Sequence, residues 1–308
     1  MARLAAAALD LEPDAVGVAS TGVIGVPLPM DRVAVGIAAA AAALSPEGGE
    51  DAARAIMTTD TFPKQTAVQV ELGGVVVTIG AMAKGSGMIH PNMATMLGFV
   101  TTDAAVAPAA LRKALQEGAA RSFNMITVDG DTSTNDMVIA MANGLAGNPT
   151  VTADSRDYPA FAAALEQVLV YLAREIARDG EGATKLIEVR VQGARSLEDA
   201  RLAARAVCGS SLVKAAVFGE DANWGRVLAA LGYSGAQFDP GRVDLWLGGV
   251  QMMAAGAPVA FDEKAAAEVL RGREVVFTAH LHAGDAAATA WGCDLTYDYV
   301  KINGSYRT

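Results

Sequence analysis

The chain has 308 residues, of which 52% are hydrophobic but only 6% aromatic, and its formal net charge is −10. This length allows one large or two medium domains with enough core to fold without cross-links. The negative charge argues against a nucleic-acid partner and against an anionic membrane surface, because both reward positive charge. An anionic substrate stays compatible with it, since such a substrate needs only a few local cations.

The cysteines and the N-terminal residues indicate where in the cell the protein is expected. Cys208 and Cys293 are the two cysteines, too few for a disulfide framework and typical of a reducing compartment. Residues 1–11 contain one arginine and reach Asp10 without a secretory pattern. The longest uncharged apolar run nearby, residues 33–44, falls short of the roughly 20 residues that cross a bilayer. We expect a soluble, cytoplasmic protein.

Up to residue 123 the sequence predicts a mixture of helices and strands. The Gly73-Gly74 pair predicts a hairpin turn, because glycine adopts the backbone angles that tight turns require. The predicted elements are a helix over 1–12, a strand over 16–19, a helix over 29–44, strands over 56–59, 66–72, 75–80 and 96–101, and a helix over 108–123.

The second part opens with a polar loop between residues 124–129 and 136–142, and then gives the clearest helical pattern. Residues 158–179 carry apolar side chains at helical spacing, and Gly180 is suited to end that helix. Strands adjoin one another in sequence as often as they alternate with helices, so we predict an α+β fold with a domain boundary near residue 190. The remaining predictions are a strand over 184–192, a helix over 196–208, and strands over 243–247, 275–281 and 294–301.

The segment from Lys84 to Phe99 holds the strongest indication of chemistry. It contains a glycine-rich turn, a proline, and a run in which the Thr95 hydroxyl follows the small residue Ala94. Such a hydroxyl can attack the preceding carbonyl, and hydrolysis of the ester would leave Thr95 as a new N-terminus. Its freed α-amine, with an ordinary pKa of about 8, can activate the hydroxyl. A threonine in an apolar strand is the ordinary alternative.

This segment resembles the processing site of the ornithine acetyltransferase (bifunctional glutamate N-acetyltransferase) family. The resemblance runs from about residue 15 to the C-terminus, and further motifs occur in the expected order. They lie at residues 21–25, 58–61, 123–136, 179–185, 219–226 and 297–303. Family members usually carry roughly ninety more residues before the region that matches Met1, so the resemblance leads us to expect a missing N-terminal segment.

The resemblance implies an acetyltransferase of arginine biosynthesis, which moves the acetyl group of N2-acetyl-L-ornithine to L-glutamate through an acetyl ester of Thr95. It also implies self-cleavage between Ala94 and Thr95, a layered sheet and helix sandwich of the N-terminal-nucleophile type, and assembly of two large with two small chains. Residues 1–190 would carry the nucleophile, and residues 191–308 would form a smaller α+β domain with a substrate-binding tail. No cofactor is expected, and acetyl-CoA stays open as a second acetyl donor.

The family places its oxyanion hole at Thr21 and Gly22. A glycine N–H beside a threonine hydroxyl can aim two donors at a developing oxyanion, although a plain turn would be the ordinary interpretation. Lysine suits the carboxylate of an acetylated amino acid and glutamate suits the ornithine ammonium; a surface lysine and a solvated glutamate are the alternatives. The substrate positions that the resemblance implies are Thr58, Lys84, Thr95, Glu181, Asn303 and Thr308.

Other polar groups carry weaker indications. The loop from Asp129 resembles a calcium loop, but Thr134 and Ala140 occupy positions that need glycine and glutamate, so side chains that cap turns are predicted instead. His280 and His282 lack a third ligand at useful spacing, so no metal site is predicted. One further cluster is predicted to be structural and consists of Glu220, Asp221 and Arg226.

Two rival functions stay open. The first is a self-processing aminopeptidase or amidohydrolase with the same nucleophile, in which water takes the acyl group. The second is an inactive, unprocessed fragment that binds a ligand without turnover.

Overall fold

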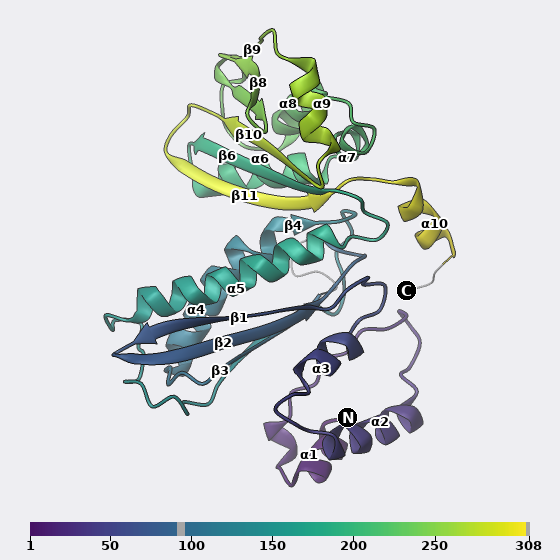
Figure 1. Cartoon of the computed structure of the whole chain (residues 1–308), viewed down its shortest axis with the longest axis vertical. Coiled ribbons are helices and arrows are strands. Elements are labelled where there is room, and N and C mark those ends of the chain that lie inside the picture. The colour runs from purple at the N-terminus through teal and green to yellow at the C-terminus, as the bar shows by residue number, and fades with distance from the viewer. Residues whose placement is uncertain (91–95, 306–308) are drawn as a thin grey trace.

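The computed structural model describes residues 1–90 and 96–305. Within these ranges the strands form two sheets, and helices lie between them (Figure 1). A continuous cluster of buried apolar side chains reaches from one sheet to the other. The α+β prediction is therefore confirmed.

The first sheet has four strands in the order β1-β2-β3-β5. Its hairpin turns at Gly73 and Gly74, whose φ angles of 60° and 83° favour glycine. β3 pairs antiparallel with β2 and parallel with β5. The strands are β1 (Lys64–Leu72), β2 (Val75–Lys84), β3 (Leu97–Thr102) and β5 (Met137–Ala142).

The second sheet has seven strands in the order β4-β11-β6-β10-β7-β8-β9. It is mixed: β6 pairs parallel with β10 and antiparallel with β11. Its strands are β4 (Ile126–Thr127), β6 (Leu186–Ala194), β7 (Asp244–Leu247), β8 (Val250–Ala254), β9 (Ala257–Pro258), β10 (Glu274–His280) and β11 (Ala286–Cys293).

Helix α5 (Tyr158–Arg178) lies between the sheets, with α4 (Pro108–Arg121) beside it (Figure 1). Its predicted apolar stripe contacts β1 and β2 on one side and β11 on the other. Fully buried side chains such as Leu165, Leu169 and Leu172 each stabilise the fold by about 1.5–3 kcal/mol. Neither α5 nor any other helix in the described ranges is long and apolar enough to cross a membrane.

Most other helices after α5 accompany the second sheet. α6 packs on β6 and β11, α9 packs on β10, and α10 leaves the end of β11 (Figure 1). These helices are α6 (Leu197–Gly209), α7 (Ser211–Phe218), α8 (Trp224–Tyr233), α9 (Glu263–Arg271) and α10 (Tyr297–Ser305).

The N-terminal helices form a layer of their own beyond the first sheet (Figure 1). Of residues 1–57, all of which the structure describes, only Ala6 and Ala53 are buried. α1 packs against α2, while α3 contacts β1 and β2. These helices are α1 (Ala2–Leu9), α2 (Met30–Ala42) and α3 (Gly49–Ala55).

Three short strand predictions are wrong. Residues 16–19 lie in a loop and residues 56–59 form the turn after α3, so neither run pairs its backbone with another strand. At residues 294–301 the strand has already ended with β11. The Thr296 hydroxyl accepts the Tyr299 N–H at 3.2 Å and starts α10 there.

The predicted domain boundary near residue 190 falls inside β6. β4 precedes that boundary in sequence and pairs with β11 of the second sheet. The division into residues 1–190 and 191–308 stays a prediction.

Candidate active site

A cavity of about 140 Å³ brings together five side chains or backbone positions that the sequence singled out. They come from the loop before α2, the turn after α3, the end of β2 and the turn after α5. The five are Thr21, Gly22, Thr58, Lys84 and Glu181. Segments far apart in the sequence therefore meet at one cavity.

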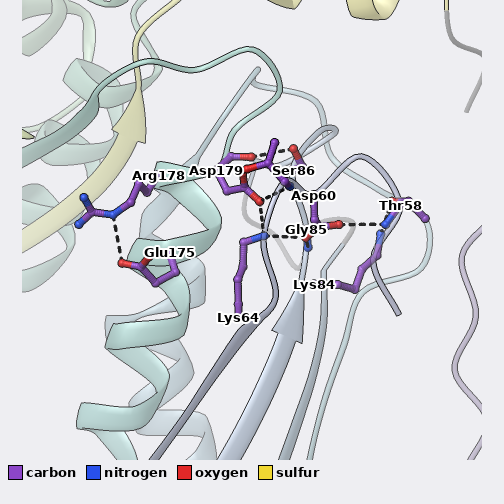
Figure 2. Close-up of polar contacts among 10 residues, drawn as sticks. Thr58, Asp60, Lys64, Lys84, Gly85, Ser86, Glu175, Arg178 and Asp179 are labelled. Atoms are coloured by element: carbon purple, nitrogen blue, oxygen red, sulfur yellow. Dashed lines mark hydrogen bonds and ion pairs between the residues drawn. The ribbon is translucent and has the colours of Figure 1, made fainter. Parts of the chain in front are cut away.

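Lys84 ends β2 and is buried at 3% exposure. Its Nζ donates to the Thr58 Oγ1 at 3.0 Å (Figure 2). Burial lowers the pKa of Lys84, and the nearby Asp60 acts against that lowering. A buried ammonium next to a hydroxyl can bind a carboxylate with little competition from water.

The loop after β2 carries the glycine-rich turn toward residue 90. Asp129 holds it from the other side, because its carboxylate accepts the N–H groups of Met88 and Ile89 at 2.6 and 3.0 Å. Met88 has a φ of 56°, which few residues adopt without such support. Asp129 also accepts the N–H of Asp131 at 3.3 Å, which confirms the predicted turn cap within its own loop.

Glu181 lies in the turn after α5, with 6% of its surface exposed. Its N–H donates to the Ser86 carbonyl at 3.0 Å, which joins this turn to the loop after β2. A Cβ on Gly87 would lie 2.4 Å from the Glu181 carboxylate, so any larger residue at position 87 would displace that carboxylate. Gly87 and Glu181 thus lie side by side in the wall of the cavity.

Helix α10 touches the same acid from the other side. The Asn303 Nδ2 donates to the Glu181 Oε2 at 2.8 Å, so the substrate position predicted at Asn303 is next to Glu181. A second cavity, of about 220 Å³, is lined by Glu181, Asn303, Tyr299 and Asp129. Burial and the neighbouring acids, first of all Asp129, raise the pKa of the Tyr299 hydroxyl.

Three predicted residues lie outside the described ranges, namely Ala94, Thr95 and Thr308. The described residue next to the predicted cut is Met96, whose N–H donates to the Asp136 Oδ1 at 2.8 Å. Burial raises the pKa of Asp136 to about 6, while the Met96 N–H and Lys84 lower it. A buried carboxyl therefore holds the backbone immediately after Thr95.

Sequence reasoning missed a buried ion cluster, which consists of Asp60, Lys64 and Asp179. The Lys64 Nζ lies between the two carboxylates, 2.7 Å from the Asp60 Oδ1 and 2.5 Å from the Asp179 Oδ2 (Figure 2). Both acids stand in motifs of the resemblance, at residues 58–61 and 179–185, and could have been found there. Lys64 stands in none of these motifs.

The polar loop at residues 130–135 also contributes more than the sequence indicated. Ser133, Thr134 and Asn135 line the first cavity together with Lys84 and Glu181. The sequence resembles a calcium loop here only superficially, and three residues of this stretch contribute to the wall of the first cavity.

The remaining polar groups serve the scaffold. Glu220 forms an ion pair with Lys185 at 3.1 Å, and Asn223 caps α8. The rings of His280 and His282 have centres 4.0 Å apart and planes tilted by 50°, and the His282 Nε2 lies 2.7 Å from the Asp244 Oδ2. Within the described ranges, no group of three or more His, Cys, Asp or Glu side chains has the arrangement of a metal site.

Comparison with known proteins identifies the family. The model of the ArgJ family matches residues 1–308, which is the whole chain. The chain belongs to the ArgJ family. This agrees with the resemblance drawn from the motifs around Thr95.

Individual ArgJ relatives are similar along nearly the whole chain. An arginine biosynthesis bifunctional protein ArgJ from Symbiobacterium thermophilum is 80% identical over 308 residues, which are 100% of this chain and 77% of that protein. The protein of the same name from Bacillus subtilis is 54% identical over 98% of this chain and 74% of its own length. The crystal structure of an ArgJ protein from Bacillus halodurans superposes with a TM-score of 0.68 at 48% identity, over 69% of this chain and 100% of that one.

Proposed function

We propose that this ArgJ-family acetyltransferase moves the acetyl group of N2-acetyl-L-ornithine to L-glutamate through an ester on Thr95. The observation that supports the proposal is the convergence of Thr21, Gly22, Lys84 and Glu181 on one cavity. The cavity offers a cation and an acid, and the substrate carries a carboxylate and an ammonium group. The charges of the site and of the substrate therefore match.

In the first half-reaction the Thr95 Oγ attacks the acetyl carbonyl, and the α-amine of Thr95 takes the hydroxyl proton. The Thr21 hydroxyl and the Gly22 N–H stabilise the tetrahedral oxyanion, where loss of one donor typically costs about 100–1,000-fold in rate. The carbon–nitrogen bond then breaks, and the proton returns to the departing amine of ornithine. The acetyl group stays on Thr95 as an ester.

In the second half-reaction the glutamate amine attacks the ester carbonyl, the bond between the acetyl carbon and the Thr95 Oγ breaks, and the proton lost by the amine passes to the Thr95 Oγ. Lys84 binds the substrate carboxylate, with the Thr58 hydroxyl as its neighbour. Glu181 binds the ornithine ammonium, and Asn303 holds the Glu181 carboxylate in place. Thr308 is proposed as a further substrate contact, and acetyl-CoA as a second acetyl donor.

The same nucleophile would first cut its own chain between Ala94 and Thr95. We propose that the two resulting pieces assemble as two large and two small chains, which native mass spectrometry would test. We also propose a cytoplasmic location, because Cys208 and Cys293 are buried free thiols, as is typical of a reducing compartment.

The decisive experiment compares the parent chain with Thr95→Ala by intact-mass spectrometry and by product analysis. The parent should give two pieces, residues 1–94 and 95–308, and should form N-acetylglutamate from N-acetylornithine and glutamate. Thr95→Ala should stay uncut and inactive, whereas Thr101→Ala, at an exposed position on β3, should behave as the parent.

Other products would point to the rival functions. Free acetate in place of N-acetylglutamate would indicate an amidohydrolase that uses the same nucleophile. An uncut parent chain that binds N-acetylornithine without product would indicate an unprocessed binding fragment. Either result would contradict the proposed function.

A further inference from the structure

We propose that Asp60 and Lys64 are positioning residues that set the place and the charge of Lys84 in the substrate cavity. The inference rests on the proposed function, in which Lys84 receives the substrate carboxylate. It assigns a role in that site to the ion cluster, whose members do not line the cavity.

The ion cluster is buried and internally paired. Lys64, Asp60 and Asp179 are exposed by 1%, 8% and 5%. A buried charge is costly unless a partner and hydrogen bonds compensate it. Lys64 supplies both acids with that partner. The remaining oxygen of Asp60 accepts the Thr58 N–H, and the remaining oxygen of Asp179 accepts the Thr61 hydroxyl. The cluster is therefore well ordered and costly to disturb.

Asp60 joins the two segments that carry Thr58 and Lys84. Its Oδ1 accepts the Gly85 N–H at 2.8 Å, and its Oδ2 accepts the Thr58 N–H at 3.1 Å. One carboxylate thus fixes the backbone of Thr58 and the residue that follows Lys84 (Figure 2). The bond from the Lys84 Nζ to the Thr58 Oγ1 closes the same ring of contacts.

Asp179 extends the connection to Glu181. Its carboxylate accepts the Thr61 N–H at 2.9 Å, and its carbonyl accepts the Ser86 hydroxyl at 2.7 Å. The Ser86 carbonyl in turn accepts the Glu181 N–H. Through Lys64, the cluster therefore holds the cation and the acid of the cavity at a fixed separation, as the two ends of one substrate require.

The charges around Lys84 give the cluster a second effect. Burial lowers the pKa of Lys84; the acids Asp60, Glu181 and Asp136 raise it, and the cation of Lys64 lowers it. Removal of Asp60 should therefore lower the pKa of Lys84 further, and removal of Lys64 should raise it. A role confined to stability would not give opposite signs.

The experiment measures kcat/KM for N-acetylornithine against pH in the full chain. Asp60→Asn should move the alkaline limb to lower pH and Lys64→Met should move it to higher pH, each by about one pH unit. The change should appear in KM rather than in kcat, because the ammonium binds the substrate. NMR of the lysine side chains, labelled with ¹³C, gives the Lys84 titration directly and without turnover.

Two matched controls remove buried charges elsewhere. Asp199→Asn alters a buried acid whose carboxylate accepts the Gln237 N–H, and Lys214→Met alters a buried lysine that donates to the Cys293 carbonyl. Neither residue is among the charged neighbours of Lys84. Both variants should lose stability and keep the alkaline limb of the parent.

The outcomes separate the inference from the proposed function. The inference is overturned if the alkaline limbs of Asp60→Asn and Lys64→Met move in the same direction. It is also overturned if neither limb moves while kcat falls. A parent chain without acetyl transfer overturns the proposed function, and the Lys84 titration then decides the inference alone. If Lys64→Met does not fold, the double variant Lys64→Met with Asp179→Asn replaces it, because it removes the cation together with one of its two acids, and Asp60 still has the charge of Lys84 nearby. Asp60→Asn leaves Lys64 paired with Asp179.

Discussion

Gly182→Ala tests whether the close packing of helix α10 on the turn after α5 keeps Glu181 in place. Gly182 has a φ of 68°, and a Cβ there would lie 2.6 Å from the Tyr299 nitrogen and 2.8 Å from the Asp298 carbonyl carbon. Both atoms are backbone in the first turn of α10, so a side-chain rotation cannot relieve the contact. The added methyl group must push α10 away from the turn.

Two costs add up in this variant. The left-handed backbone costs a residue with a Cβ about 1–2 kcal/mol. Forcing extra atoms into a packed site costs about 1–3 kcal/mol more. The sum of about 2–5 kcal/mol corresponds to a drop in Tm of roughly 3–8 °C for a chain of this size. As α10 moves, Asn303 leaves Glu181, and we expect KM for N-acetylornithine to rise about tenfold.

Gly147→Ala is the matched control, because Gly147 has a φ of 77° and no atom within 4 Å of the added Cβ. It should show only the backbone cost of about 1–2 kcal/mol and an unchanged KM. Thermal unfolding and initial rates measure both variants. Equal Tm and equal KM in the two variants would refute the collision argument.

Three further predictions concern charge and packing. Glu181→Gln should raise KM for N-acetylornithine about tenfold or more and leave KM for glutamate nearly unchanged, because only ornithine carries a side-chain ammonium; equal rises in initial-rate assays would contradict this. Folding raises the pKa of Asp136 to about 6, so its stabilising effect is present below about pH 4 and is lost as pH rises through 6. In urea denaturation at pH 8, the free energy of unfolding of Asp136→Asn should therefore exceed that of the parent by about 1–2 kcal/mol, after allowance for solvent screening, and the two should be equal at pH 4. The same difference at both pH values would argue against this assignment. Leu172→Ala should cost about 2–5 kcal/mol, because the side chain is fully buried between the sheets, and a Tm within 2 °C of the parent would be inconsistent with that.

The sequence pattern was sufficient to predict those elements that are determined by their own residues. The apolar spacing of α5 and the glycine pair of the first hairpin each predict the structure that forms. The strand expected at residues 294–301 failed because its signal is not local. The Asp294 carboxylate accepts the Thr184 and Lys185 N–H groups across the turn, and α10 then begins at Tyr297.

The site shows the same division. Thr21, Lys84 and Glu181 stand in motifs, so sequence alone could name them, and the structure brings them to one cavity. Lys64 stands alone in a strand that otherwise alternates, and nothing along the chain shows that it meets Asp179, 115 positions later. A buried ion pair between distant residues depends on tertiary packing, which periodicity and spacing do not report.

The central place of β3 in the first sheet has a consequence for the proposed self-cleavage between Ala94 and Thr95. Positions from Ile79 to Lys84 pair with positions from Thr102 to Leu97, so the ladder between β2 and β3 joins the two sides of the cut. The two fragments would stay associated through these backbone hydrogen bonds, as one folded protein with an additional N-terminus and C-terminus. A denaturing gel would then show two bands where native chromatography shows a single species.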